Sequence, residues 1–126
     1  MKTFLILLAF SLCAFQAGAA EVRGARLDAN KKNLLIDVTY GGGCAKHTFK
    51  LAIGACRETF PVSCDATLVE KITGGVDLCE AIISQTVKIN LKRAGLTDTY
   101  YRQGTLTIFG DQLFNGDTSQ ATVTLP

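Results

Sequence analysis

Cysteines constrain the fold of this chain more than any other feature of its sequence. The chain has 126 residues and five cysteines. Cys13 lies in an apolar N-terminal segment, and the other four are Cys44, Cys56, Cys64 and Cys79. An even number of cysteines in a small exported domain predicts two disulfides, which support a core of limited size.

The N-terminus predicts export. In "MKTFLILLAFSLCAFQAGAA" one lysine precedes an uncharged apolar run and then small residues, as in a secretory signal peptide. We expect cleavage after Ala19 or Ala20 and favour Ala20, so residues 1–20 are removed and residues 21–126 form a single domain. Leu12 stands before Cys13, where a lipoprotein signal needs a small residue, so acylation is not expected. The predicted localisation is secreted or periplasmic.

The charge balance bears on the partners of the exported chain. The formal net charge of +2 falls to +1 when Lys2 is removed with the signal peptide. So small a charge argues against binding that depends on nucleic-acid phosphates or anionic lipids. Later segments are not apolar enough to span a bilayer. We therefore expect no nucleic-acid partner, no stable membrane insertion after cleavage, and a protein or glycan partner outside the cytoplasm.

Apolar and polar residues alternate with a period of two along most of the mature chain. The pattern covers residues 34–40, 47–53, 79–91, 105–109 and 121–125. Such alternation predicts strands with one buried face, and glycine- and asparagine-rich turns separate them. Residues 79–85 also fit the start of a short helix. The predicted fold is all-β, a single antiparallel β-sandwich or barrel of about seven or eight strands.

Strand geometry selects one pairing of the four cysteines. We expect residues 45–54, 65–72 and 79–91 to form an antiparallel meander. Cys44 and Cys79 then lie at one end of the sheet, and Cys56 and Cys64 lie at the other. A 44–56 bridge would have to span roughly 30 Å, whereas a disulfide joins Cα atoms about 4.4–6.8 Å apart. The predicted disulfides are Cys44–Cys79 and Cys56–Cys64.

The segment "YGGGCAKHTFKL" contains His47, the only histidine of the chain. Zinc binding needs three or four ligands and a Cys–His catalytic pair needs a free thiol, so paired cysteines argue against both. His47 shares the inward face of its strand with Phe49. It is interpreted as a partly buried imidazole bonded to a carbonyl or carboxylate, or as a polar anchor at the mouth of a binding site. The glycines at 41–43 form a sharp corner or admit a partner closely.

The segment "CRETFPVSC", residues 56–64, encloses seven residues with a proline near the middle. In length and in the place of Pro61 it resembles the reactive loop of Bowman–Birk-type serine-protease inhibitors. It departs from that pattern in having one proline, and Arg57-Glu58 where Thr-Lys or Thr-Arg is usual. The resemblance implies Glu58 as the specificity residue and Arg57 and Phe60 as contacts. The alternative is a cross-linked hairpin end without a binding role.

Other candidate residues are fewer. Tyr100-Tyr101-Arg102 is either an exposed aromatic and basic patch, with Tyr101 in the binding surface, or one core tyrosine beside one surface tyrosine. Three glutamates, Glu58, Glu70 and Glu80, are the candidate carboxylates of a hydrolase. The sequence contains no nucleophile-elbow, phosphate-loop or dinucleotide motif. We expect no metal site, no cofactor and no catalytic residue.

These observations predict an exported, non-catalytic binding protein that recognises a macromolecule or ligand in the envelope or extracellular space. The most concrete form is an inhibitor of a secreted hydrolase. One alternative is a structural or surface protein that self-associates. The other is a small secreted hydrolase that uses a carboxylate or His47 in acid–base chemistry.

Overall fold

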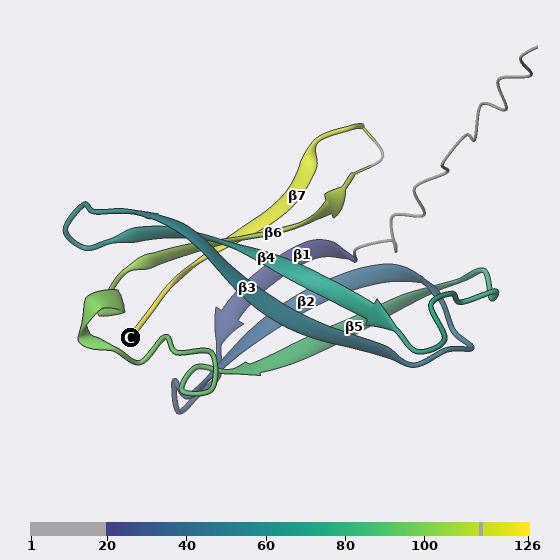
Figure 1. The fold of residues 1–126 in the computed structure, drawn as a ribbon, viewed down its shortest axis with the longest axis horizontal. Helices are drawn as coiled ribbons and strands as arrows, with labels where there is room; N and C mark the ends of the chain where they lie inside the picture. The colour runs from purple at the N-terminus through teal and green to yellow at the C-terminus, as the bar shows by residue number, and fades with distance from the viewer. Residues whose placement is uncertain (1–19, 114) are drawn as a thin grey trace, which may run out of the picture.

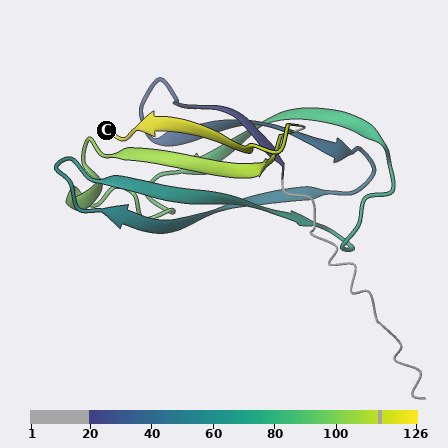
Figure 2. The ribbon, with the colours of Figure 1, turned by 90° about the horizontal axis from the view of Figure 1, so that it is seen from above.

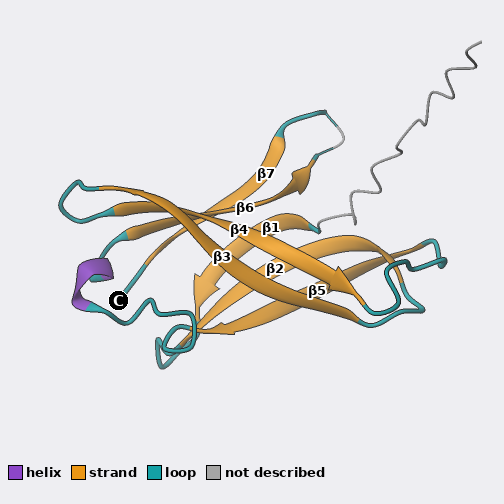
Figure 3. Cartoon of the chain, viewed as in Figure 1, coloured by secondary structure: helices purple, strands orange, loops and turns teal. Residues whose placement is uncertain are grey.

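The computed structural model describes residues 20–113 and 115–126. The predicted signal peptide, residues 1–20, lies outside the described residues except for Ala20. Within the described part, the chain forms seven strands and one short 3-10 helix (Figures 1 and 3). They are β1 (Glu21–Leu27), β2 (Asn33–Gly42), β3 (His47–Arg57), β4 (Ser63–Ile72), β5 (Ala81–Asn90), η1 (Thr99–Tyr101), β6 (Thr105–Gln112) and β7 (Thr118–Thr124). In residues 20–113 and 115–126 no helix has the length and apolar character needed to cross a membrane.

The strands form two sheets, so the protein is nearly all β, as predicted. One sheet has the order β1-β2-β5 and the other the order β3-β4-β6-β7. All neighbouring pairs are antiparallel except β4 and β6, which are parallel. The prediction of a purely antiparallel fold is therefore wrong for this pair. Parallel neighbours need a long crossover, and here β5 and the loop before η1 supply it.

The predicted meander of residues 45–54, 65–72 and 79–91 is also wrong. β3 and β4 do form a hairpin, but β5 pairs with β2 in the other sheet. Period-two alternation identifies the buried face of a strand and leaves its neighbour undetermined. The alternative of a helix at 79–85 is wrong too, because Ala81–Asn90 is a strand.

Both predicted disulfides are confirmed despite the different strand order. Gly42 at the end of β2 is paired with Ala81 at the start of β5, and this brings the flanking Cys44 and Cys79 together. Their Cα atoms are 5.6 Å apart. Cys56 and Cys64 are paired across the β3–β4 hairpin, with a Cα separation of 4.0 Å. Two disulfides are typical of proteins that fold in an oxidising environment outside the cytoplasm.

Apolar side chains of the two sheets form one buried cluster. Leu34, Ile36 and Val38 of β2 are buried, as their alternation predicts. They share the cluster with residues of the four-stranded sheet, among them Ala66, Leu68, Leu106 and Ile108. The strands of both sheets run along the long axis of the molecule (Figure 2).

The two sheets are in contact along one side and open along the other. At the closed side the Val22 N–H donates to Ser119 Oγ over 3.0 Å, and the Asp111 N–H donates to the Ala20 carbonyl over 3.0 Å. At the other side the edge strands β3 and β5 face each other. There the inward side chains of Phe49 and Ile89 are only half-buried. The apolar layer is therefore covered less completely at the β3–β5 side.

Candidate functional site

The predicted site residues fall into two separate places. His47 begins β3 and Arg57 ends it, which puts them roughly 30 Å apart along the strand. Glu58 and Phe60 lie beyond Arg57 in the hairpin loop, and η1, which contains Tyr101, lies at that same end of the molecule (Figure 1). His47 therefore lies apart from the other candidate residues.

His47 lies between two acidic side chains. Its Nδ1 is hydrogen-bonded to Glu70 Oε1 from β4, and its Nε2 lies 2.7 Å from Asp77 Oδ2 in the loop before β5. The side chains of His47, Glu70 and Asp77 are each only 1–2% exposed. Register explains the first contact, because Glu70 faces Phe49 on the adjacent strand and points to the inner face. A doubly bonded imidazole with two anionic neighbours favours the protonated form.

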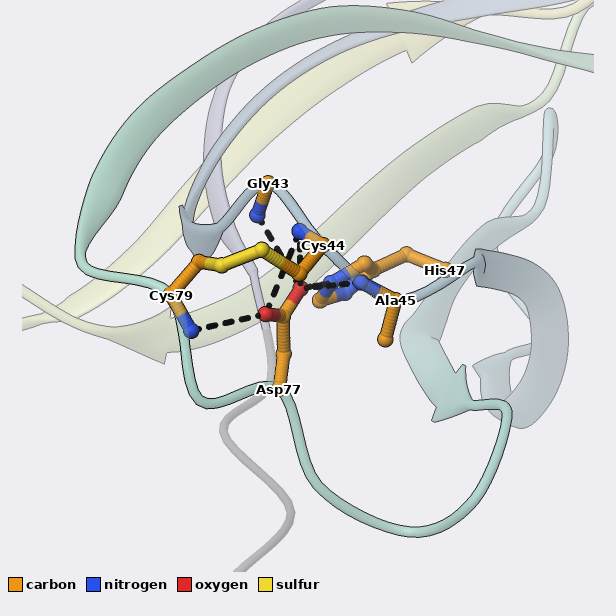
Figure 4. The surroundings of a disulfide bond; sticks show 6 residues. All are labelled: Gly43, Cys44, Ala45, His47, Asp77 and Cys79. Atoms are coloured by element: carbon orange, nitrogen blue, oxygen red, sulfur yellow. Dashed lines mark hydrogen bonds and ion pairs between the residues drawn. A yellow bond between two sulfur atoms is a disulfide. The ribbon is translucent and has the colours of Figure 1, made fainter.

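Asp77 also fixes the loop that carries the first disulfide (Figure 4). Its carboxylate accepts N–H bonds from Gly43, Ala45 and Cys79 over 3.0–3.1 Å, and from Cys44 over 3.3 Å. These bonds and above all the bond to His47 hold the pKa of Asp77 well below its usual value, against a smaller opposing effect of burial. One carboxylate thus joins the imidazole to both partners of the disulfide.

The charge of the imidazole is set by opposing effects. Burial alone would lower the pKa of His47, but the hydrogen bonds and charges of Asp77 and Glu70 outweigh it and raise that pKa above its usual value. Tyr40 stacks on the ring with a centroid separation of 4.4 Å, an arrangement that suits an imidazolium. Burial, together with the charges of the two acids, also raises the pKa of Tyr40.

Glycine is required at position 42 by the close approach of His47 and Asp77. A Cβ built on Gly42 would lie 2.8 Å from His47 Nε2 and closer still to Asp77 Oδ2. Gly41, by contrast, has open space where its Cβ would be. The groups that approach the backbone closely at Gly42 are therefore His47 and Asp77 of the protein itself.

The geometry around His47 is that of a structural network. The two sulfurs and an Asp77 oxygen come within 4.8 Å of one another, as in a metal site. The sulfurs are bonded to each other, however, and the carboxylate is already occupied by N–H donors. The almost complete burial of the imidazole also argues against its use as an acid or base on a substrate. Of the two interpretations of His47, the buried, carboxylate-bonded imidazole is the one that this geometry supports.

The hairpin loop between Arg57 and Ser63 has the opposite character. Phe60 is fully exposed at its tip, and Arg57 and Glu58 are exposed beside it. The Cys56–Cys64 disulfide closes the base of the loop, and Thr59 Oγ1 donates to the Pro61 carbonyl over 2.9 Å inside it. The loop therefore presents a large apolar side chain from a restrained backbone.

The tyrosines lie close to the base of that loop. The Thr105 N–H donates to the Val62 carbonyl over 2.9 Å, and a Cβ on Gly104 would come within 3.0 Å of both Val62 and the Tyr101 carbonyl. Tyr101 is half-buried against the core, whereas Tyr100 is exposed and meets it edge to face at 5.0 Å. Of the two alternatives for this segment, one core tyrosine beside one surface tyrosine fits this arrangement. Tyr101 therefore offers less contact area than Tyr100.

The three candidate carboxylates are dispersed. Glu58 is in the hairpin loop, Glu70 is buried beside His47 towards the other end of β4, and Glu80 is exposed just after Cys79. The arrangement does not pair them as a glycosidase would. Asp77 was not a candidate, because it lies in an irregular loop; its position two residues before Cys79 was the only available signal.

Comparison with known proteins gives no further guide to function. The chain matches no family model, and no significant match was found among curated proteins or among solved structures.

Proposed function

We propose that this protein is an exported, non-catalytic binding protein that contacts its partner through the disulfide-closed loop around Phe60. In this proposal the signal peptide directs the chain to the periplasm or the cell exterior, and the two sheets form a β-sandwich that carries the loop. The partner is a protein or a glycan. The observation that carries the proposal is the full exposure of Phe60 on a cross-linked loop.

A fully exposed phenylalanine lowers the solubility of a protein, and its burial against a partner makes a favourable contribution to the free energy of binding. Burial of such a side chain contributes roughly 1.5–3 kcal/mol, and central aromatic residues dominate many interfaces. The disulfide restrains the loop before binding, so less conformational entropy is lost in the complex. Arg57 and Glu58 flank the tip with opposite charges and can add electrostatic selectivity.

The most concrete form of this proposal is an inhibitor of a secreted hydrolase. The loop length and the place of Pro61 support it, and Glu58 in the exposed loop would be the residue that selects the protease. This form predicts inhibition of a protease that prefers glutamate. A non-inhibitory adhesin-like or scaffold role uses the same surface without blocking an active site.

The test uses the disulfide-intact protein as bait in extracts of the producing cells and their medium. Phe60→Ser is compared with wild type, and Leu78→Ser is the matched control, since Leu78 is also exposed but lies before β5. We expect a stoichiometric partner that Phe60→Ser loses by about 30-fold or more in affinity and Leu78→Ser retains. A panel of secreted proteases then tests the inhibitor form.

Two results would count against the proposal. Equal retention of the partner by wild type and Phe60→Ser would show that Phe60 is not part of the interface. Concentration-dependent dimers in size-exclusion chromatography that Phe60→Ser abolishes would instead favour the self-associating alternative.

A further inference from the structure

A cleft of about 640 Å³ opens between β3 and β5, on the side where the two sheets are not closed by β1. Its apolar wall consists of Phe49, Leu51, Ile89 and Ala94, all half-buried. Ligand sites for small molecules have volumes of about 300–1,000 Å³ and mostly apolar walls. No residue of the loop between Arg57 and Ser63 lines the cleft, and the inference does not depend on the function proposed for that loop.

The rim of the cleft is cationic. Lys50, Lys88 and Arg93 line it together with two asparagines, and none of these described lining residues is acidic. None of the three cations forms an ion pair within 4.0 Å in the described part of the chain. The pKa of Asp28 is lowered mainly by a hydrogen bond from Asn33, and the charge of Lys88 contributes the smallest part of that lowering. Asp28 lies outside the lining.

Hydrogen bonds of the backbone and of two asparagine side chains fix the rim. The Leu91 N–H donates to the Lys32 carbonyl over 3.0 Å, and the Arg93 N–H donates to Asn90 Oδ1 over 3.0 Å. The Asn33 side chain is engaged by Asp28 over 2.7 Å. Arg93 is therefore carried on a fixed turn beside the apolar wall.

We propose that this cleft binds an anionic amphiphile: an acyl or alkyl chain against Phe49, Leu51 and Ile89, with a carboxylate or phosphate head at Lys50, Lys88 and Arg93. The apolar wall recovers the hydrophobic energy of the chain, and the unpaired cations select the sign of the head group. A small net charge does not oppose this, because the cations are local to the cleft.

The test is a titration of the disulfide-intact protein followed by amide NMR shifts, with probes below their micellar concentrations. The probes share a ten-carbon chain: decanoate, decyl phosphate, 1-decanol and decyltrimethylammonium. We expect saturable shifts in β3, β5 and residues 91–95 with one or both anions. Preference for decanoate indicates a free fatty acid, and preference for decyl phosphate indicates a phospholipid-type head. Octanoate, two methylenes shorter, is expected to bind up to about 15-fold more weakly than decanoate.

Variants test the cationic rim. Lys50→Gln and Arg93→Gln are each expected to weaken binding of the anion about two- to fivefold, since each removes one exposed charge. Lys92→Gln is the matched control, because Lys92 is exposed next to Arg93 without lining the cleft. Phe60→Ser should leave the affinity unchanged, which separates this site from the hairpin loop.

Several outcomes would overturn the proposal. They are the absence of saturable shifts with either anion, equal affinity for 1-decanol and decanoate, or shifts confined to the exposed Val76–Ile82 region. An equal loss of affinity in Lys92→Gln and Arg93→Gln would show that the cations lining the cleft are not specific contacts of the head group.

Discussion

Replacement of His47 by leucine is expected to lower the free energy of unfolding by about 3 kcal/mol, the low end of the range for breaking a buried ion pair. The side chain is 2% exposed and makes one bond to each of two acidic side chains. The low end applies because the network lies just beneath the surface loops that contain Cys44 and Asp77. For a domain of this length the change corresponds to a decrease in Tm of about 12 °C.

The loss should come largely from Glu70. Its Oε2 is already buried without a hydrogen-bond partner in the described structure, so leucine at position 47 leaves both oxygens unpaired. Asp77 keeps its four backbone donors. Adding Glu70→Leu to His47→Leu should therefore restore about 1–2 kcal/mol, even though a second side chain has been changed.

The effect of His47 should depend on pH in a defined direction. Its pKa is raised in the folded protein, so its contribution is complete below the unfolded value of about 6.5 and is lost as pH rises through the folded value. The lowered pKa of Asp77 acts at the other end, where stability falls as pH drops below about 4. Stability should therefore be greatest between about pH 4 and 6.5.

Urea denaturation followed by circular dichroism, under non-reducing conditions at pH 5.5 and 8.5, measures these effects. Lys46→Leu is the control, since Lys46 is exposed immediately before His47. The difference between wild type and His47→Leu should be larger at pH 5.5 than at pH 8.5. A pH-independent difference, or a double variant no more stable than His47→Leu alone, would refute this account of the network.

Three further predictions concern stability and processing. Gly42→Ala should destabilise by about 2 kcal/mol in the same denaturation assay, because its Cβ would enter the imidazole–carboxylate pair, whereas Gly41→Ala should have little effect. Replacing the Cys44–Cys79 bridge by serines should cost about 4 kcal/mol and the Cys56–Cys64 bridge about 2.5, because their sequence separations are 35 and 8; equal losses would argue against a loop-entropy origin. Ala20 is 1% exposed and its carbonyl accepts from Asp111, so the structure favours cleavage after Ala19 over the site after Ala20 that the sequence favoured. If the chain is exported as proposed, the intact mass of the mature protein should begin at Ala20, and a mass beginning at Glu21 would show that this packing is dispensable.

Much of the local structure could be predicted from the sequence. Leu34, Ile36 and Val38 alternate with polar residues, and this pattern placed them correctly on the buried face. The cysteine pairs were also predicted correctly, although the strand order used to derive them was wrong. The predicted meander and the actual fold give the same pairs because both place Cys44 and Cys79 at one end of a sheet. In the actual fold this follows from the pairing of β2 with β5.

The remaining features depend on contacts that local patterns do not encode. The strand β1 was not predicted, since "EVRGARL" alternates weakly and its pairing with β2 is shifted between Val22 and Gly24. The parallel neighbours β4 and β6 are joined through a segment of the other sheet, which alternation cannot reveal. Asp77 acquires its role only because the loop before Cys79 folds back onto the glycine corner.

The contacts of β1 have a consequence for the order in which this protein can fold. β1 pairs early in the sequence with β2, but the Val22 N–H bonds to Ser119 in β7, 97 residues later. During synthesis β1 emerges first and β7 emerges last, so the inner face of β1 stays uncovered until the whole chain has been released. Such long-range closure slows folding and leaves apolar surface open to aggregation in the interval. Chaperone protection of the nascent chain should therefore matter most for this first strand.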